Sequence, residues 1–532
     1  MLTKNQKDMK KKAETRQSVF SKIKLVFTRK GKTPKKAGPD VKKTSGSGVA
    51  SDPYQSERPH DIAQLKPDFI SHEIGQIKAL LHQSKYVSTY LDSLSEKGSS
   101  EPIENIILND EAFSKYACYH NKPVARYYAA DLVGLGFFEL LLSDHKYKNE
   151  RITDIGYNSN HFLTVETNMR KFVYGNREGQ PRINNEVIMD IINKMTEQTG
   201  DEGRAFTKTF PLYNGSNKFY HLRISATHPS VSPYGPTLSI RVAGPYLALT
   251  EKNFNEFAPM NKKLNVLRLL KVFIKCHLNI MISAKTGAGK TELQKFLIKF
   301  IPDVEERIIL MEDTQEMYLP DLFPKKDIFS WLSGHRKGAN TITDLIVHSL
   351  RNAPIWLIVA ETRGAEAYEM FQGVKTDHSI ITTLHSSSNA AVPSRFAGMI
   401  QEGYGNMKTE FLERDFLDFM NIGIHLTIKK FHGRRVRYLD EIAEYLPVSE
   451  KYPNGVNVLF KQTINAAGIR TYYTGAPSKK LQNKIYEASD HYITKKMWPQ
   501  YSAKEPIKEV AVPELYDAYR QELKRRKDHY NG

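Results

Sequence analysis

The sequence has only two cysteines, Cys118 and Cys276, among its 532 residues. Two thiols cannot build a disulfide framework or a four-cysteine zinc module. We therefore expect both side chains to be buried in the fold and the protein to lie in a reducing compartment. No apolar run approaches the ~18 residues that a membrane-spanning helix needs, and the charged segment after Met1 lacks the apolar core of a signal peptide. These absences favour a cytoplasmic protein, and a length of 532 residues predicts about three units.

Positive charge is concentrated at the start of the chain. Residues 1–50 carry 15 Lys and Arg against 3 Asp and Glu, which is a net charge of +12 out of +18 for the whole chain. We expect residues 1–60 to form a basic, mostly disordered arm. The apolar residues of 19–27 fall on one helical face, so a helix that binds an anionic membrane surface and a disordered tail both fit. The remaining +6 does not favour direct nucleic-acid binding.

A glycine-rich segment in the middle of the chain carries the clearest chemical signal. The apolar run Leu278–Ile282 predicts a buried strand, and the spacing of apolar residues in Leu293–Leu297 predicts a helix. A glycine-rich turn that ends in Lys290 and Thr291 between a strand and a helix is the context of a phosphate-binding P-loop. Lys290 would reach the β- and γ-phosphates of ATP, and Thr291 would ligate Mg²⁺. The expected nucleotide-binding residues are Lys285, Thr286, Gly287, Ala288, Gly289, Lys290 and Thr291.

Three further clusters follow the ends of predicted strands. Ligands of open α/β sheets bind beyond the carboxyl ends of the strands, so these clusters should converge on the P-loop. Glu312 could orient the attacking water and accept its proton. Glu361, after the apolar run Ile355–Val359, could hold Mg²⁺ or be the base instead, and a salt bridge with Arg363 is the structural alternative. His385 could contact the γ-phosphate, although a lone histidine is more often structural.

The order of the predicted elements gives a domain plan. Helical patterns over 70–96 and 124–142, followed by short strands and a helix at 185–198, predict an α+β domain. Apolar runs alternating with helices downstream predict a mostly parallel sheet. The plan is a basic arm at 1–60, a helical lead-in and α+β N-terminal domain at 61–245, a linker at 246–261, a P-loop domain at 262–447 and a C-terminal extension without a motif at 448–532.

Four segments, in a fixed order, resemble the sequence boxes of one family. They are the Walker A segment 284–291, the Asp box 307–316, the Walker B segment 359–367 and the His box 381–386. In order and spacing they are similar to the type II/type IV secretion traffic ATPases, over roughly residues 125–447. Ala284 and Ala360 stand where the family has glycine. The plan is most similar to the conjugation-type and tad-type members.

The resemblance implies an α/β fold with a RecA-like P-loop NTPase domain, preceded by a smaller α+β domain, in a homohexameric ring. It implies an ATP- and Mg²⁺-dependent motor, peripheral to the cytoplasmic membrane, that works with the inner-membrane proteins of a type IV secretion or conjugation machine, or of a related type II or tad pilus machine. It also implies that Arg223 and Arg241 reach the γ-phosphate, although ordinary strand-edge positions are the alternative. The candidates are Glu312, Glu361, His385, Arg223 and Arg241 for catalysis, and Thr291 and Glu361 for the metal.

Two other functions remain open. One is a nucleic-acid translocase with the same core, which DNA-stimulated ATP hydrolysis would reveal. The other is an ATP-bound structural subunit with little hydrolysis, which Ala284 and Ala360 make conceivable and which a phosphate-release assay separates from an enzyme. The sequence does not indicate the cargo or the docking partner.

Overall fold

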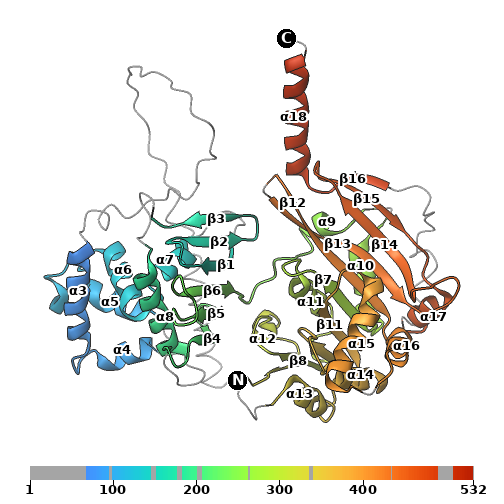
Figure 1. Cartoon of the computed structure of the whole chain (residues 1–532), viewed down its shortest axis with the longest axis horizontal. Helices are drawn as coiled ribbons and strands as arrows, with labels where there is room; N and C mark the ends of the chain where they lie inside the picture. Colours follow the sequence, from blue (N-terminus) through green and yellow to red (C-terminus); the bar gives the residue numbers. More distant parts are fainter. Residues whose placement is uncertain are drawn as a thin grey trace, which may run out of the picture. The chain divides into compact units, whose positions relative to one another are not determined.

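The structure is a computed structural model, and Figure 1 traces it along the sequence. The basic arm and the apolar face within residues 19–27 lie outside the described part. The described residues are 67–94, 99–144, 151–176, 183–199, 206–217, 219–261, 264–334, 340–405, 407–432, 434–488 and 507–530.

Short helices form the first part of the described chain, and all but the last of them share one apolar cluster around Ile77, Ile103 and Tyr128. The helix predicted over 70–96 is two helices, and the one predicted over 124–142 is interrupted. The interruption follows from Gly136, whose φ of +57° lies in the left-handed region that a helix cannot contain. The elements are α3 (Pro67–Leu81), α4 (Val87–Ser93), α5 (Glu101–Asn109), η1 (Glu111–Phe113), α6 (Lys122–Val133) and α7 (Phe137–Asp144).

The α+β domain contains an antiparallel sheet in the order β3-β2-β1-β6-β5-β4. Its elements are β1 (Ile152–Tyr157), β2 (Leu163–Thr167), β3 (Lys171–Tyr174), α8 (Asn185–Thr199), β4 (Leu212–Asn217), β5 (Leu222–Thr227) and β6 (Thr237–Val242). Strands β3 and β4 were not predicted, because few of their side chains are buried. Arg223 on β5 lies directly opposite Arg241 on β6. Directly opposed residues share a face, so the register brings the two guanidinium groups together.

A ten-stranded sheet forms the core of the P-loop domain, in the order β16-β15-β14-β13-β12-β7-β11-β10-β8-β9. The run from β12 to β9 is parallel, so the mostly parallel sheet that we predicted for this region is confirmed. The strands are β7 (Ile280–Ala284), β8 (Ile308–Glu312), β9 (Ile328–Leu332), β10 (Trp356–Val359), β11 (Ser379–His385), β12 (Ile422–Phe431), β13 (Arg434–Tyr445), β14 (Val456–Ile464), β15 (Ile469–Thr474) and β16 (Ile507–Val510). The carboxyl ends of parallel strands lie at the same edge of the sheet, and Glu312, Glu361 and His385 lie at or just after these ends.

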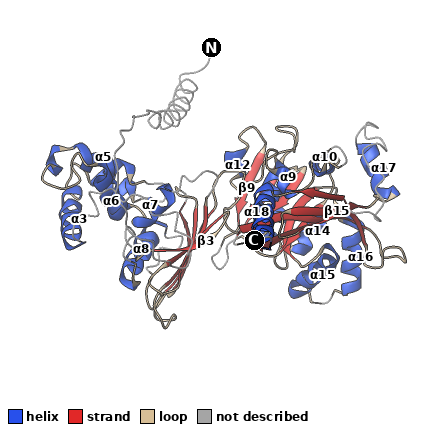
Figure 2. Cartoon of the chain, turned by 90° about the horizontal axis from the view of Figure 1, so that it is seen from above, coloured by secondary structure: helices blue, strands red, loops and turns tan. Residues whose placement is uncertain are grey.

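Helices cover both faces of this sheet (Figure 2). One apolar cluster includes Leu267 of α10 and Leu293 of α11, and the other includes Phe371 of α14 and Phe396 of α15. The helices and turns of this part of the chain are α9 (Phe254–Phe257), α10 (Val266–Lys275), α11 (Lys290–Ile298), α12 (Leu319–Leu322), α13 (Ile342–Ser349), α14 (Ala367–Lys375), η2 (Asn389–Ala391), α15 (Val392–Gly403), α16 (Thr409–Phe419), α17 (Lys479–Ala488) and α18 (Pro513–Tyr530). Both cysteines are buried, as we expected from their number.

The C-terminal extension, which carried no readable motif, contributes β14, β15 and β16 to the same sheet as the P-loop strand. Its Arg470 is fully buried. The guanidinium donates to Glu509 Oε1 at 2.7 Å and to the main-chain oxygens of Asn255 and Glu256 at 2.6 and 3.0 Å. The extension therefore holds the end of the linker against the sheet. Within the described residues, no helix combines the length and the apolar character that crossing a membrane requires.

Candidate active site

The glycine-rich loop joins the end of β7 to the start of α11, as the sequence predicted. Gly287 and Gly289 have φ angles of +77° and +99°, in the region that only glycine adopts at little cost. Ala284 differs, because it is the last residue of the extended strand β7 and its side chain is buried in the core. An alanine therefore fits at this position. The loop leads the chain into the amino end of α11, where main-chain N–H groups favour an anion.

Lys290, the first residue of α11, is only 9% exposed. Its Nζ lies 3.1 and 3.2 Å from the two ring nitrogens of His385, and 3.8 Å from Glu361 Oε1. His385 Nε2 is 3.0 Å from the same carboxylate oxygen, and His385 Nδ1 is 3.1 Å from the carbonyl oxygen of Ala284. Burial lowers the pKa of the Lys290 ammonium. The structure thus brings together three of the residues that we selected from separate parts of the sequence.

Glu361 follows β10 and lies between several cations. Its Oε2 accepts a hydrogen bond of 2.7 Å from Arg363, which is the salt bridge we considered as the structural alternative. Although burial acts in the opposite direction, this hydrogen bond and the charge of Lys290 hold the pKa of Glu361 below its ordinary value. Its Oε1 is buried and faces His385 Nε2 at 3.0 Å and Lys290 Nζ at 3.8 Å. An ionised carboxylate beside the loop suits a metal ligand.

Glu312 has a different position from the one we expected of a residue facing the γ-phosphate. It ends β8, is 1% exposed, and its Oε1 accepts the main-chain N–H groups of Glu316 and Met317 at 3.1 and 3.0 Å. Its Oε2 is buried without a hydrogen-bond partner in the described structure. The carboxyl group thus holds the turn after β8. Burial raises its pKa to about 7.

Glu316, in contrast, meets the two arginines of the N-terminal domain. Its Oε1 lies 3.2 Å from Arg223 Nη1 and 3.8 Å from Arg241 Nη1. Arg241 also donates from Nε to Asp154 at 3.2 Å. The charges of Glu316 and Arg241 both act on Lys290, so these groups belong to one electrostatic site. Glu316 is the last residue of the Asp box 307–316, but our sequence analysis did not single it out.

The raised pKa of Glu312 gives a prediction about stability. Because its folded pKa of about 7 lies above the ordinary 4.5, folding takes up a proton between these values, and stability falls as the pH rises through that window. The loss should be on the order of 3 kcal/mol, at ~1.4 kcal/mol for each pH step of one. Glu312→Gln cannot ionise and should lack this loss. In urea unfolding, the free energy of unfolding of the variant minus that of the parent should therefore increase from pH 4 to pH 8. A difference that stays constant with pH would contradict a buried carboxyl group that titrates in this window.

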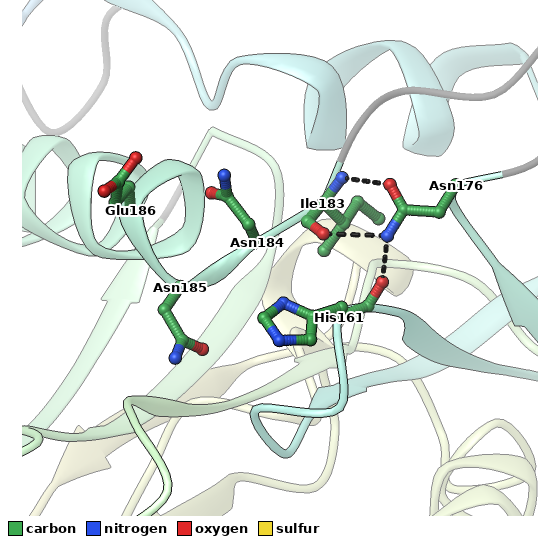
Figure 3. A pocket seen from close by; sticks show the side chains of 6 residues that line it. All are labelled: His161, Asn176, Ile183, Asn184, Asn185 and Glu186. Atoms are coloured by element: carbon green, nitrogen blue, oxygen red, sulfur yellow. Dashed lines mark hydrogen bonds between the residues drawn. The ribbon is translucent and has the colours of Figure 1, made fainter.

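A separate hollow of about 560 Å³ lies in the α+β domain (Figure 3). Asn176 is central to it, because its side chain bonds to the main chain of His161 and Ile183. None of the residues that we selected lines this hollow. Its lining consists of His161, Asn176, Ile183, Asn184, Asn185 and Glu186.

Residues 201–412 match the sequence profile of a family described as "Type II/IV secretion system protein". An uncharacterised protein of Bacillus anthracis is 34% identical over 421 residues, which are 77% of this chain and 89% of that protein. The type IV secretion system protein VirB11 of Bartonella henselae is 32% identical over 162 residues, and that match spans only 45% of its length and 30% of this chain. The X-ray structure of the ATPase DotB of Legionella pneumophila is 17% identical, covers 64% of this chain and 83% of its own, and has a TM-score of 0.38.

Proposed function

Because the chain belongs to the family of type II/type IV secretion system ATPases, we propose that it hydrolyses ATP to drive a secretion machine. The observation that carries the proposal is the convergence of Lys290, Glu361 and His385 at the glycine-rich loop. These residues follow or end three different strands, β7, β10 and β11, and up to 95 positions separate them in the sequence. A buried lysine beside the amino end of a helix and an ionised carboxylate is an arrangement suited to binding a nucleoside triphosphate.

In this proposal the loop N–H groups and Lys290 bind the phosphates of ATP. The ammonium now lies 3.8 Å from Glu361, and it would exchange this contact for the β- and γ-phosphate oxygens. Thr291 and Glu361 would hold Mg²⁺, and the lowered pKa of Glu361, which keeps its carboxylate ionised beside the loop, supports that assignment. When bound, Mg²⁺ neutralises charge on the β- and γ-phosphates. His385, beside both Lys290 and Glu361, would keep the two side chains in position.

We propose Glu316 as the base, in place of Glu312, because Glu312 binds the main chain of its own turn. Glu316 would orient a water molecule and accept its proton while the water oxygen bonds to the γ-phosphorus, and ADP leaves. Glu361 is the second candidate for this role. Arg223 and Arg241, which now pair with Glu316, would move their charge to the γ-phosphate oxygens that develop negative charge.

The arginines provide a test of the proposed site. Arg223→Ala and Arg241→Ala should each lower the rate of ATP hydrolysis about tenfold or more, since a hydrogen bond to a charged group contributes about 1.5–3 kcal/mol. Arg395→Ala is the matched control, because Arg395 is an exposed arginine of α15 in the P-loop domain. Phosphate release is measured at saturating ATP for all three variants. Equal rates for the arginine pair and the control contradict a site that includes the N-terminal domain.

The motor itself is proposed on the family and on the VirB11 relatives, which are type IV secretion system proteins. We propose a homohexameric ring at the cytoplasmic face of the inner membrane, bound to the membrane proteins of a secretion or conjugation complex. Residues 1–50, with their net charge of +12, would bind an anionic membrane surface. With ATP bound, a measured particle mass that differs from the mass of six chains would contradict the ring.

Equal binding to anionic vesicles by the full chain and by a chain that lacks residues 1–50 would contradict the role of the arm.

A further inference from the structure

Arg437 of β13 makes two hydrogen bonds to main-chain oxygens from different parts of the fold. Its Nε donates to the carbonyl oxygen of Gly287 at 2.8 Å, and its Nη1 donates to the carbonyl oxygen of Asn168 at 3.0 Å. Gly287 lies in the glycine-rich loop, and Asn168 lies in the turn between β2 and β3 of the α+β domain. One guanidinium group therefore connects the phosphate-binding loop to the N-terminal domain.

The start of β13 makes further contacts with the same turn. Arg435 forms an ion pair with Glu166 of β2, and its main-chain N–H donates to Met169 O at 3.4 Å. The turn is itself ordered by local bonds, since Thr167 Oγ1 accepts the N–H groups of Met169 and Arg170 at 3.2 and 3.0 Å. The carbonyl that Arg437 binds is thus held in a defined place.

The other end of the bridge is the glycine-rich loop, which is open around Gly287. Gly287 has a left-handed φ of +77°, and a Cβ built on it would meet no atom within 4 Å. Among the described residues, no carboxylate lies within 4.0 Å of the Arg437 guanidinium, so its bonds are to carbonyl oxygens rather than to an acid. A planar group with five donors is suited to hold two acceptors at once. The side chain therefore serves as a link between the loop and the turn.

We propose that Arg437 is a positioning residue that couples the conformation of the glycine-rich loop to the position of the N-terminal domain. While the bridge is intact, the Gly287 carbonyl is fixed and the loop N–H groups keep the orientation that receives phosphate. When the two domains move apart, the bond to Asn168 breaks and the loop loses an anchor. The part of this inference that concerns hydrolysis rests on the proposed function, and the part that concerns the loop does not.

The test uses the full chain with Arg437→Lys and Arg437→Gln. Lysine keeps the charge but lacks the planar fork, so it cannot hold both carbonyls in the same geometry. Arg434→Gln is the matched control, because Arg434 lies on the same strand but pairs with Glu514 of α18 at 3.4 Å. Without nucleotide, amide hydrogen exchange in loop 285–289 and in turn 167–170 should be several-fold faster in both Arg437 variants than in the parent and the control.

With ATP, kcat should fall about tenfold in Arg437→Lys while KM changes much less, as for a lost charge-assisted hydrogen bond that positions the loop. If Arg437→Lys has both the exchange rate and the kcat of the parent, the inference is overturned, because a positive charge without the planar guanidinium would then be enough to hold the loop. Exchange in Arg437→Gln that equals the Arg434→Gln control also overturns it. The exchange measurement needs no turnover, so a parent that fails to hydrolyse ATP would count against the proposed function only.

Discussion

Replacing Lys290 by alanine should lower ATP hydrolysis by about 100-fold or more, the scale on which removal of one preorganised charge-stabilising group slows an enzyme. Lys290 is 9% exposed at the first turn of α11, where the neighbouring charges act with little screening by water. It is also a positive group beside the proposed site for a highly charged nucleotide. The measurement is the rate of phosphate release at saturating ATP.

The control for this variant is Lys275→Ala, because Lys275 is an exposed lysine at the end of α10 in the same domain. It removes the same charge without touching the loop and should retain the parent rate. A Lys290→Ala protein that keeps more than half of the parent rate, while its circular dichroism is unchanged, contradicts the assignment of the loop as the phosphate site.

Glu316→Gln should retain ATP binding and lose hydrolysis by a factor of about 10²–10⁴, the usual contribution of a general base. Glutamine has nearly the same shape and keeps one oxygen toward Arg223 and Arg241, but it cannot accept a proton at neutral pH. The variant should therefore remain loaded with ATP. Single-turnover hydrolysis and binding of a fluorescent ATP derivative, measured on one preparation, separate the two effects.

Glu312→Gln is the comparison that decides between the two glutamates of the turn. Since Glu312 Oε1 accepts two main-chain N–H groups, the amide oxygen of glutamine can replace it, and this variant should hydrolyse ATP far faster than Glu316→Gln. The reverse order would return the base role to Glu312. Parent-like hydrolysis in both variants would transfer it to Glu361.

The glycine-rich loop between a strand and a helix could be predicted because its signals are local. A buried apolar strand, glycines at the turn and Lys290 at the start of a helix lie within about 20 residues, and each has a backbone reason. The parallel strands were readable for the same reason, since strands buried on both faces form continuous apolar runs. Strands β3, β14 and β16 mix polar and apolar residues and gave no such run.

The parts of the site that the sequence did not reveal depend on tertiary contacts. Glu312 is the last residue of β8 and is buried like the rest of the strand, whereas Glu316 lies in the turn beyond it and is only partly buried. The amino-acid composition of the turn does not distinguish the two carboxylates. Arg437 contacts residues that lie 150 and 269 positions away, and no local pattern marks it. Arg223 and Arg241 were selected from the resemblance, and the register of β5 and β6 supplies the physical reason that they act together.

The central claim is that this chain hydrolyses ATP at the glycine-rich loop, and steady-state phosphate release by the purified full-length protein tests it most directly. We expect release that saturates with ATP, requires Mg²⁺ and is abolished in the Lys290→Ala variant. Binding of ATP without release of phosphate by the parent protein, under conditions in which the loop is folded, would contradict the claim and favour an ATP-bound structural subunit.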